Sequence, residues 1–309
     1  MATLMIAAAP GHAPGAEMDH NSPSVGWPLE GQRSRQMSFR LTTSSLLLLA
    51  LAGTATYSYA QFGRAFRGAS LRMAPEEMPD RGFTVCRIMY DSVRAEPEGI
   101  GWRTDYPYGE INLMIRLSEL TRTPVSLGQG RQPNHWVVRL TDDALFNCPY
   151  TVASDVGTMG LSAEESERLR LYLLKGGFLW VDDFWGSAAW EHWSREISTV
   201  LPEYAIEDVP LDDPIFSSQF AVEQVPQIPR LPFWLAVNGT STSERGADSA
   251  DVRLRAIRDG HGRIMVVMTH NNDVADSWER EADDPAYFQQ FSPDGYALGI
   301  NVLLHAMTH

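Results

Sequence analysis

Residues 83–309 carry alternating blocks of two hydrophobic patterns, one typical of buried strands and one typical of helices. The block 83–90 is mostly apolar and predicts a strand, whereas 107–121 has apolar side chains at helical spacing. Shorter strands are predicted at 124–127, 135–140 and 150–153. Because strands and helices alternate, we expect a single α/β domain with an open, mostly parallel sheet.

The most informative segment is 162–197. Ser162 and Glu165 have the spacing of a capping box, which predicts that a helix begins there. Gly176-Gly177 favours the end of that helix, since glycine readily adopts the left-handed conformation found after helices. The apolar run 178–181 then predicts a buried parallel strand. It leads into the motif Asp182-Asp183-Phe184-Trp185-Gly186, and a second helix is predicted through Trp190, Trp193 and Ile197.

The last third of the chain is rich in loops after Pro202. Two apolar blocks, 252–258 and 263–268, flank the turn sequence Asp259-Gly260-His261-Gly262 and predict a hairpin. The block 297–307 predicts a closing helix. We therefore expect one domain over 83–309 that ends in a hairpin and a helix.

The first 82 residues have a different character. Residues 1–36 lack periodicity and are interpreted as an upstream or disordered tail. Residues 37–60 combine a basic start, a short apolar core and Ser58-Tyr59-Ala60, which is the pattern of a secretory signal peptide. We expect cleavage near Ala60, a linker over 61–82 and a periplasmic or extracellular protein. No apolar run is long enough to span a bilayer, so no transmembrane span is predicted in the mature chain.

Composition narrows the range of functions. The chain has 25 basic and 39 acidic residues and a formal net charge of −14, which argues against nucleic-acid binding. It lacks the glycine-rich loops that bind nucleotides, so no nucleotide cofactor is predicted. It also lacks the nucleophile elbow of serine and cysteine hydrolases, so an activated serine or cysteine lacks its usual setting. Export implies an oxidising compartment. A bridge between Cys86 and Cys148 is possible there, but we favour two buried thiols.

Candidate chemistry concentrates where the predicted strands end. Ligands of open α/β sheets bind beyond the carboxyl ends of the strands, which selects the candidate catalytic residues Asp182, Asp183, His270 and Asp273. The same residues are candidate ligands of a divalent metal, because carboxylates and imidazole coordinate such ions. Carboxylates beside tryptophans also hold sugars or serve acid catalysis. Structural roles remain open, with Asp183 as a helix cap and His270 as a hydrogen-bond partner of Asp273.

Many short motifs in a fixed order resemble those of one bacterial family, the domain of unknown function numbered 4159. These motifs are Asp105-Tyr106-Pro107, Asn112-Leu113 with Arg116-Leu117, Leu140-Thr141-Asp142 with Leu145-Phe146, 172–179, Asp182-Asp183-Phe184-Trp185-Gly186, Pro226-Gln227-Ile228-Pro229, Glu244-Arg245-Gly246, His270-Asn271-Asn272-Asp273, Leu298-Gly299-Ile300-Asn301 and 306–309. The resemblance runs from about Phe83 to the C-terminus.

The resemblance implies a class I glutamine amidotransferase-like, flavodoxin-like fold without the catalytic cysteine. Longer relatives carry membrane segments before this domain and resemble proteins linked to MoxR-type ATPases, whereas this chain has a signal peptide in that place. The family has no assigned reaction, so its motifs mark a site without naming its chemistry. As ligand-binding candidates they give Asp105, Tyr106, Asn112, Arg116, Trp185, Glu244, Arg245 and Asn271.

Simpler roles compete at several of these positions. Asp105 can be a helix N-cap beside Pro107, the Asn112 and Arg116 stripe can be a solvated helix face, and Glu244 with Arg245 can be an ion pair in a turn.

Two functions are therefore expected from the sequence. The first is an exported, non-catalytic module that binds a ligand or an envelope protein or glycan partner. The second is a hydrolase of envelope glycan or peptide that uses carboxylates or a divalent metal. In the second, Asp182 or Asp183 is the general base or a metal ligand, His270 and Asp273 are acid or ligands, and Arg245 holds an anionic group.

Overall fold

The computed structural model describes residues 71–308, all within one unit that spans Ala65–His309. The predicted tail over 1–36, the signal peptide over 37–60 and the first part of the linker lie outside the described residues. The strands are β1 (Val85–Met89), β2 (Asp91–Ser92), β3 (His135–Arg139), β4 (Tyr150–Ser154), β5 (Met159–Gly160), β6 (Phe178–Phe184), β7 (Ile206–Asp208), β8 (Arg253–Arg258) and β9 (Ile264–His270).

Seven of these strands form one sheet in the order β3-β1-β4-β6-β9-β8-β7. The first five are parallel, and β8 and β7 extend the sheet in antiparallel pairs. A separate pair, β2 and β5, is antiparallel. The prediction of a mostly parallel α/β sheet is confirmed. All five parallel strands end at the same edge, so the loops that follow them meet there.

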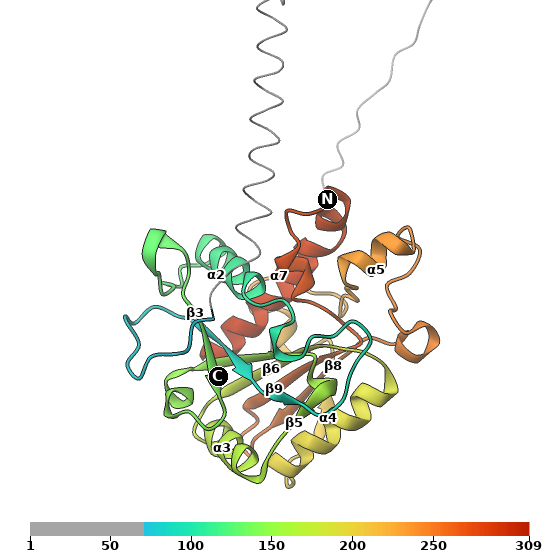
Figure 1. Ribbon diagram of the computed structural model, residues 1–309. Coiled ribbons are helices and arrows are strands. Elements are labelled where there is room, and N and C mark those ends of the chain that lie inside the picture. Colours follow the sequence, from blue (N-terminus) through green and yellow to red (C-terminus); the bar gives the residue numbers. More distant parts are fainter. Residues whose placement is uncertain (1–70, 309) are drawn as a thin grey trace, which may run out of the picture. The chain divides into compact units, whose positions relative to one another are not determined.

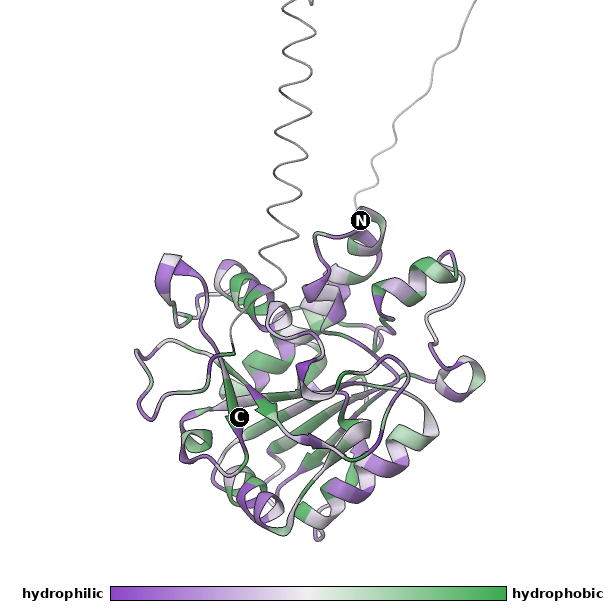
Figure 2. Ribbon diagram, viewed as in Figure 1, coloured by the Kyte–Doolittle hydropathy of each residue, from purple (hydrophilic) through white to green (hydrophobic). Residues whose placement is uncertain are grey.

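Helices cover both faces of the sheet (Figure 1). The helices are α2 (Tyr108–Leu120), α3 (Ala163–Leu174), α4 (Gly186–Val200), α5 (Leu231–Ala236), α6 (Asp276–Glu279) and α7 (Pro285–Thr308), with short 3-10 helices at Gly101–Arg103, Gln129–Arg131, Asp143–Asn147, Val156–Thr158, Pro214–Phe216 and Gly246–Ser249. One apolar core lies between the sheet and α2, α6 and α7, and a second lies between the sheet and α3 and α4. Hydrophobic residues follow the strands in Figure 2, whereas the helices alternate in hydropathy.

The local predictions hold where a specific side chain decides the structure. Ser162 Oγ accepts a hydrogen bond from the Glu165 backbone and Glu165 returns one, so the capping box is confirmed. The predicted hairpin is also confirmed, because β8 and β9 pair across the turn and Asp259 binds the backbone of His261 and Arg263.

Other elements differ from the predictions. Residues 124–127 form only isolated bridges at Val125 and Leu127, since the prolines at 124 and 133 cannot donate to a ladder. The closing helix begins at Pro285, twelve residues before the predicted start, and spans Pro293. Its early turns are held by the burial of Tyr287 and Phe291. Strand β7 and helix α5 were not predicted.

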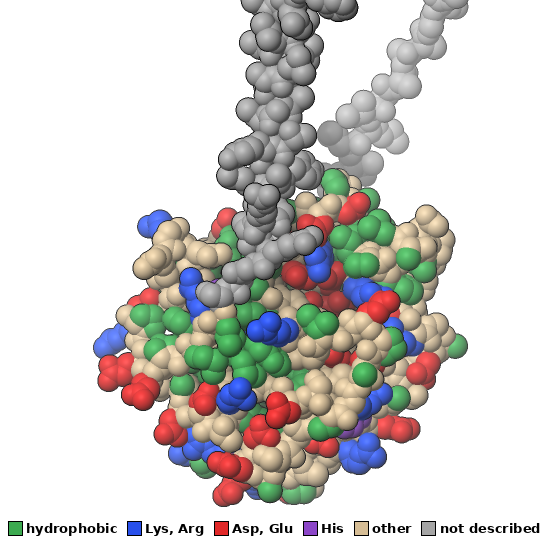
Figure 3. Space-filling model, in the orientation of Figure 1, with side chains coloured by type: hydrophobic (Ala, Val, Ile, Leu, Met, Phe, Trp, Pro, Cys, Tyr) green, Lys and Arg blue, Asp and Glu red, His purple; other side chains and the backbone are tan. Residues whose placement is uncertain are grey.

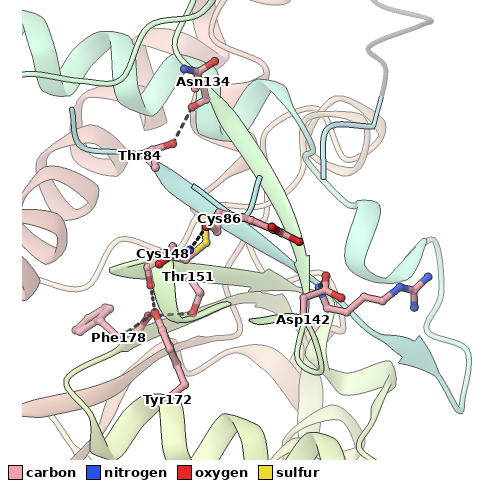
Figure 4. Close-up of a disulfide and its surroundings, with 11 residues drawn as sticks. Thr84, Cys86, Asn134, Asp142, Cys148, Thr151, Tyr172 and Phe178 are labelled. Atoms are coloured by element: carbon pink, nitrogen blue, oxygen red, sulfur yellow. Dashed lines mark hydrogen bonds between the residues drawn. A yellow bond between two sulfur atoms is a disulfide. The ribbon is translucent and has the colours of Figure 1, made fainter. Parts of the chain in front are cut away.

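The two cysteines form a disulfide, so the expectation of two buried thiols is wrong (Figure 4). Cys86 lies on β1 and Cys148 lies just before β4, which is the parallel neighbour of β1. This pairing brings the two Cα atoms to 5.9 Å, within the range that a disulfide spans. The Tyr172 hydroxyl donates to the Cys148 carbonyl at 2.8 Å and fixes the same corner.

The end of the predicted linker joins the sheet edge. Met73 bridges Val137 of β3 in parallel, and the Ala74 N–H donates to the Val137 carbonyl at 2.8 Å. Between residues 71 and 308, none of the helices combines the length and the apolar character that crossing a membrane requires.

Candidate functional site

A cavity of about 330 Å³ opens at the edge where the parallel strands end. Asp155 directly follows β4, Asp183 lies at the end of β6, and Asp273 follows β9. Asp105 comes from the connection between β1 and α2. In Figure 3 acidic side chains gather with basic ones near the middle of the upper half of the face shown. The site therefore stands where ligands bind in sheets of this kind.

Three carboxylates converge on the cavity floor. One carboxylate oxygen from each of Asp105, Asp273 and Asp276 lies within 4.8 Å of the other two, and all three residues are buried. Asp105 Oδ2 accepts a hydrogen bond from Ser154 Oγ at 3.1 Å. Asp273 Oδ1 accepts one from the Asp276 backbone at 3.0 Å. These bonds leave each carboxylate with further acceptor capacity.

Basic partners are distributed unevenly over these carboxylates. Asp276 has one, because Arg280 Nε lies 3.3 Å from its Oδ1. Within 71–308, no arginine, lysine or histidine lies within 4.0 Å of a carboxylate oxygen of Asp105, Asp183 or Asp273. Buried carboxylates without a basic partner must bind protons or a cation.

The backbone is strained at three of the acidic positions. Asp105, Asp155 and Asp183 have φ values of 65°, 55° and 52°, a region that side-chain-bearing residues adopt at a cost of about 1–3 kcal/mol. Asp183 adopts it within the last residues of β6, where the pairing of β6 with β9 is irregular between Val181 and Phe184. Its side chain lines the cavity, and its Oδ1 accepts a hydrogen bond from Trp185 Nε1.

Burial and mutual repulsion shift the protonation of the cluster. Burial, followed by repulsion from Glu279 and Asp276, raises the pKa of Asp105 well above its usual range. Burial and the neighbouring carboxylates likewise raise the pKa of Asp183 and of Asp273. At the rim, burial raises the pKa of Asp155 to about 6 and that of Glu279 to about 7. The ionised cluster is therefore costly unless a cation is bound.

Arginines also line the cavity, but most of them already pair with carboxylates or bind a backbone carbonyl. Nine acidic residues and four arginines line the cavity, so its lining has a formal excess of negative charge. Arg280 pairs with Asp276, and Arg230 pairs with both Glu244 and Glu98. Arg245 donates to the Pro97 carbonyl at 3.1 Å. The cavity therefore favours a ligand that carries positive charge or brings a metal ion.

The sequence matches the family model of DUF4159, a domain of unknown function, over residues 85–307. The chain belongs to the DUF4159 family. No curated protein matches the chain. The matched region contains every helix and strand from β1 to α7, apart from the last residue of α7. All of the carboxylates on the cavity floor therefore lie within the DUF4159 domain.

The structure brings together part of the residue set predicted from the sequence. Seven of the predicted residues line the cavity of this DUF4159 domain, namely Asp105, Tyr106, Asp183, Trp185, Glu244, Arg245 and Asp273. Five do not line it, namely Asn112, Arg116, Asp182, His270 and Asn271. The sequence neighbours Asp182 and Asp183 thus have different roles, because only Asp183 lines this cavity.

Asp182 holds the segment before α6. Its Oδ1 accepts from Thr269 Oγ1 at 2.5 Å and its Oδ2 accepts from the Ala275 backbone at 2.9 Å. Burial raises its pKa to about 6, although these hydrogen bonds act in the opposite direction. The residue connects β6 to the segment that carries Asp273 and Asp276.

We expect Asp182→Ala to lower the free energy of unfolding by about 1–3 kcal/mol, because it leaves the buried Ala275 N–H without an acceptor. Chemical denaturation measures this effect. Asp183→Ala is the matched control, since within 71–308 its carboxylate accepts a hydrogen bond only from the Trp185 indole. Equal losses in the two variants would contradict the separation of roles.

His270, Asn271 and Asn272 hold backbone groups and do not line the cavity. His270 Nε2 donates to the Gly186 carbonyl at 3.1 Å, and Asn271 Oδ1 accepts from the Gly186 N–H at 2.7 Å. Asn272 binds the loop before α5 through the Ile228 N–H and the Pro226 carbonyl. These contacts fix the turn that presents Asp183, while Asp273 alone enters the cavity.

The His270 ring has a defined tautomer. Arg255 can only donate, so His270 Nδ1 accepts from it at 3.1 Å and Nε2 carries the proton. The ring also stacks on Phe184 and lies tilted against Trp190. Burial first, and the charge of Arg255, lower the pKa of His270 to about 4. The interpretation of His270 as a partner of Asp273 is replaced by this arrangement.

Acidification is expected to cost stability through His270. Its folded-state pKa of about 4 lies below the unfolded value of about 6.5. Stability from this residue is therefore present above about pH 6.5 and is lost as the pH falls towards 4, by up to roughly 3 kcal/mol. His270→Gln keeps an N–H for the Gly186 carbonyl but does not titrate. The difference in unfolding free energy between wild type and variant should shrink between pH 7 and 4, and a constant difference would contradict the assignment.

Asn112 and Arg116 support the site from outside. Asn112 Nδ2 donates to the Trp278 carbonyl at 2.7 Å, which ties α2 to α6. Arg116 pairs with Glu119 and Glu281 and lies over the Tyr296 ring. The stripe is therefore partly an interhelical contact and not only a solvated face.

Several cavity residues were not named as candidates from the sequence, namely Glu96, Glu98, Arg103, Asp155, Arg230 and Arg280, whereas Asp276 and Glu279 were noted only as acidic residues close behind the strand end at 270–273. Asp155 could have been found, because it follows the predicted strand at 150–153 in the same way as Asp183 follows its strand. Asp276 and Glu279 follow Asp273 at helical spacing. Arg230 gave no local signal, since a long loop brings it to the cavity.

Proposed function

We propose that this DUF4159 domain is a ligand-binding module that takes its ligand through a divalent cation held on the cavity floor. The observation that carries the proposal is the convergence of three buried carboxylates, two of which, Asp105 and Asp273, have no basic partner within 4.0 Å among residues 71–308. A bound cation would relieve their repulsion and fill their remaining acceptor sites.

The potential ligand atoms are all carboxylate oxygens, which favour a hard cation. Asp105, Asp273 and Asp276 each offer one carboxylate oxygen, and Asp183 lines the same cavity. Ions such as Mg²⁺, Ca²⁺ and Mn²⁺ prefer all-oxygen sites of this kind and keep open positions for water or a ligand. The residues present therefore fit such an ion, and His270 is not among them.

The strand order supports the flavodoxin-like and amidotransferase-like relationship. When the parallel strands are numbered along the chain, the order β3-β1-β4-β6-β9 becomes 2-1-3-4-5, which is the flavodoxin-like order. The connections after β1 and β4 run to opposite sides, and Asp105 and Asp155 stand there. Both cysteines are in the disulfide, and Asp183 lies at the end of β6 before α4, consistent with a fold of this type without its nucleophile.

A disulfide also supports export to the periplasm or beyond, since such bonds persist in oxidising compartments. The signal peptide expected over 37–60 fits the same location. In the envelope, the ligand would be a glycan or a protein group, and a link to MoxR-type ATPases rests on family resemblance alone.

One observation favours the hydrolase as a second candidate. Asp183 lies at the end of β6 with a strained φ of 52°, and burial raises its pKa. A strained, buried carboxylate beside a cation site is suited to act as a general base towards water. In this function Asp183→Asn would abolish hydrolysis while leaving the fold intact.

Thermal unfolding of the purified chain, first with EDTA and then with Mg²⁺, Ca²⁺, Mn²⁺ or Zn²⁺, tests the proposal. A cation that binds only the native state raises the melting temperature, and at one hundred times its Kd it adds about 2.7 kcal/mol. We expect a saturable increase with at least one ion that prefers oxygen ligands. The absence of any increase across the series would overturn the proposal.

A further inference from the structure

A second, much smaller cavity of about 20 Å³ lies beneath the site. It is lined from β1, α2, β4, β6 and the α6 segment by Val85, Arg87, Gly109, Glu110, Leu113, Val152, Ala153, Ser154, Trp180, Asp182, Ala275 and Trp278. Two of these side chains carry a buried polar atom with no hydrogen-bond partner among the described residues, Glu110 Oε2 and Trp278 Nε1. One is an acceptor and the other is a donor.

Size and polarity define the occupant. A cavity needs about 10–15 Å³ of this kind of volume to hold one water molecule, and the water needs at least two polar partners. The cavity volume of about 20 Å³ meets the first condition. Glu110 and Trp278 meet the second, because water can donate to a carboxylate and accept from an indole. Leaving both atoms unpaired would incur the desolvation cost of two buried polar groups.

The carboxylate that faces this cavity belongs to a chain of contacts that ends in the site. Arg87 Nε donates to Glu110 Oε1 at 2.5 Å, and Arg87 Nη1 donates to Ser154 Oγ at 2.5 Å. Both members of the Arg87–Glu110 ion pair have side chains only 2% exposed. Glu110 is thus fixed by Arg87 on one oxygen and free to bind water on the other.

Ser154 links the Arg87–Glu110 ion pair to Asp105 through hydrogen bonds. Because arginine cannot accept a hydrogen bond, Ser154 Oγ must accept from Arg87. Its hydroxyl hydrogen is then available to Asp105 Oδ2, which lies 3.1 Å away. The direction of every bond from Glu110 to Asp105 is therefore determined. Partners of this kind orient metal-binding carboxylates from behind.

We propose that one water molecule bridges Glu110 Oε2 and Trp278 Nε1, and that Glu110, Arg87 and Ser154 with this water position Asp105 in the cation site. The positioning part rests on the proposed function, whereas the water part does not. Ser154 is a positioning residue, since it acts on the cation through Asp105.

The water is tested by ¹⁵N NMR of the tryptophan indoles in the full chain. The buried indole N–H groups of Trp136, Trp193 and Trp234 also lack partners among the described residues but do not line this cavity, so they are internal controls. We expect a cross-peak between a long-lived water and the Trp278 indole proton that these controls lack. A Trp278 signal without water contact, or a crystal structure with an empty cavity, would overturn the assignment.

Positioning is tested by cation titration of Ser154→Ala. Loss of a supporting partner behind a metal ligand weakens affinity about 10–100-fold, and Ser154→Thr, which restores a hydroxyl, should recover most of it. Thr84→Ala is the matched control, because it also removes a buried hydroxyl, here bound to the Asn134 carbonyl at 3.1 Å, away from the site (Figure 4).

The outcomes separate the two proposals. Cation affinity of Ser154→Ala equal to wild type would overturn the positioning role while leaving the cation site in place. A wild-type chain that binds none of the cations would overturn the proposed function and the positioning role together. The NMR measurement would still decide the water.

Discussion

Replacing Asp273 by Asn is expected to stabilise the cation-free protein and to abolish its stabilisation by divalent cations. Asp273 is 2% exposed and has no basic partner within 4.0 Å among residues 71–308. Asparagine has nearly the same shape and no charge, so repulsion from Asp183 and Asp105 disappears. At one hundred times the Kd of the ion, the variant should lack about 2.7 kcal/mol of stabilisation that the wild type gains.

The pH dependence of this effect has a definite sign. Burial and repulsion from Asp183 raise the folded-state pKa of Asp273. The extra proton stabilises the folded protein below the unfolded pKa, and that stability is lost as the pH rises through the folded pKa. The advantage of Asp273→Asn without cation should therefore grow with pH. Chemical denaturation in EDTA at several pH values measures it.

Asp251→Asn serves as the control for this experiment, because its side chain is 87% exposed and lies outside the cavity. It should change neither the cation response nor the stability by more than a few tenths of a kcal/mol. If Asp273→Asn is instead less stable than wild type in EDTA at high pH, the carboxylate is a structural acceptor and the cation site is wrong. The same series on Asp183→Asn extends the test to the end of β6.

The strand-end rule predicted the edge of the sheet at which the cavity opens, but it could not choose between neighbouring residues. Along a strand, successive side chains point to opposite faces. Asp182 therefore follows Trp180 towards the small cavity beneath the site. Asp183 has a positive φ of 52° at the irregular end of β6, where the register of the strand shifts, and its side chain lines the cavity. No local signal predicts such a conformation for aspartate, so the sequence marked both residues equally.

His270 and Asn271 show a different limit. Their position after an apolar block indicated a site, yet their side chains hold the two backbone groups of Gly186. That contact joins the end of β9 to the start of α4, and the two are more than 80 residues apart. Helical or strand periodicity carries no information about such pairs. Polar motif residues at strand ends can thus build the frame of a site and not its lining.

Tertiary packing also decides which arginines line the cavity. Arg230 reaches the cavity because Glu244 accepts its backbone N–H at 2.7 Å and its Nε at 3.0 Å. The sequence predicted only a proline-rich loop here. Asp105 was easier to find, since it precedes a predicted helix, but its role as an N-cap is replaced by its place in the carboxylate cluster. What the pattern predicted was therefore the edge of the sheet, and the packing of distant loops decided which side chains meet there.

Reduction of the Cys86–Cys148 disulfide is expected to lower the free energy of unfolding by about 4 kcal/mol. The bond closes a segment with a sequence separation of 62, and the loss of loop entropy in the unfolded chain gives this magnitude. The loop contains α2 and β3 together with Asp105. Denaturation with and without reductant measures the effect.

The double variant Cys86→Ala/Cys148→Ala distinguishes the bond from the reductant. It should already be destabilised and should not respond to reductant, since no disulfide forms. Equal stability of oxidised and reduced wild type would contradict the entropic contribution and would remove the disulfide as support for an exported protein. If the expected loss is found, the domain in a reducing compartment keeps a much smaller margin of stability, because domains are stable by only about 5–15 kcal/mol. The stability of the whole domain would then depend on an oxidising compartment, in agreement with the proposed export.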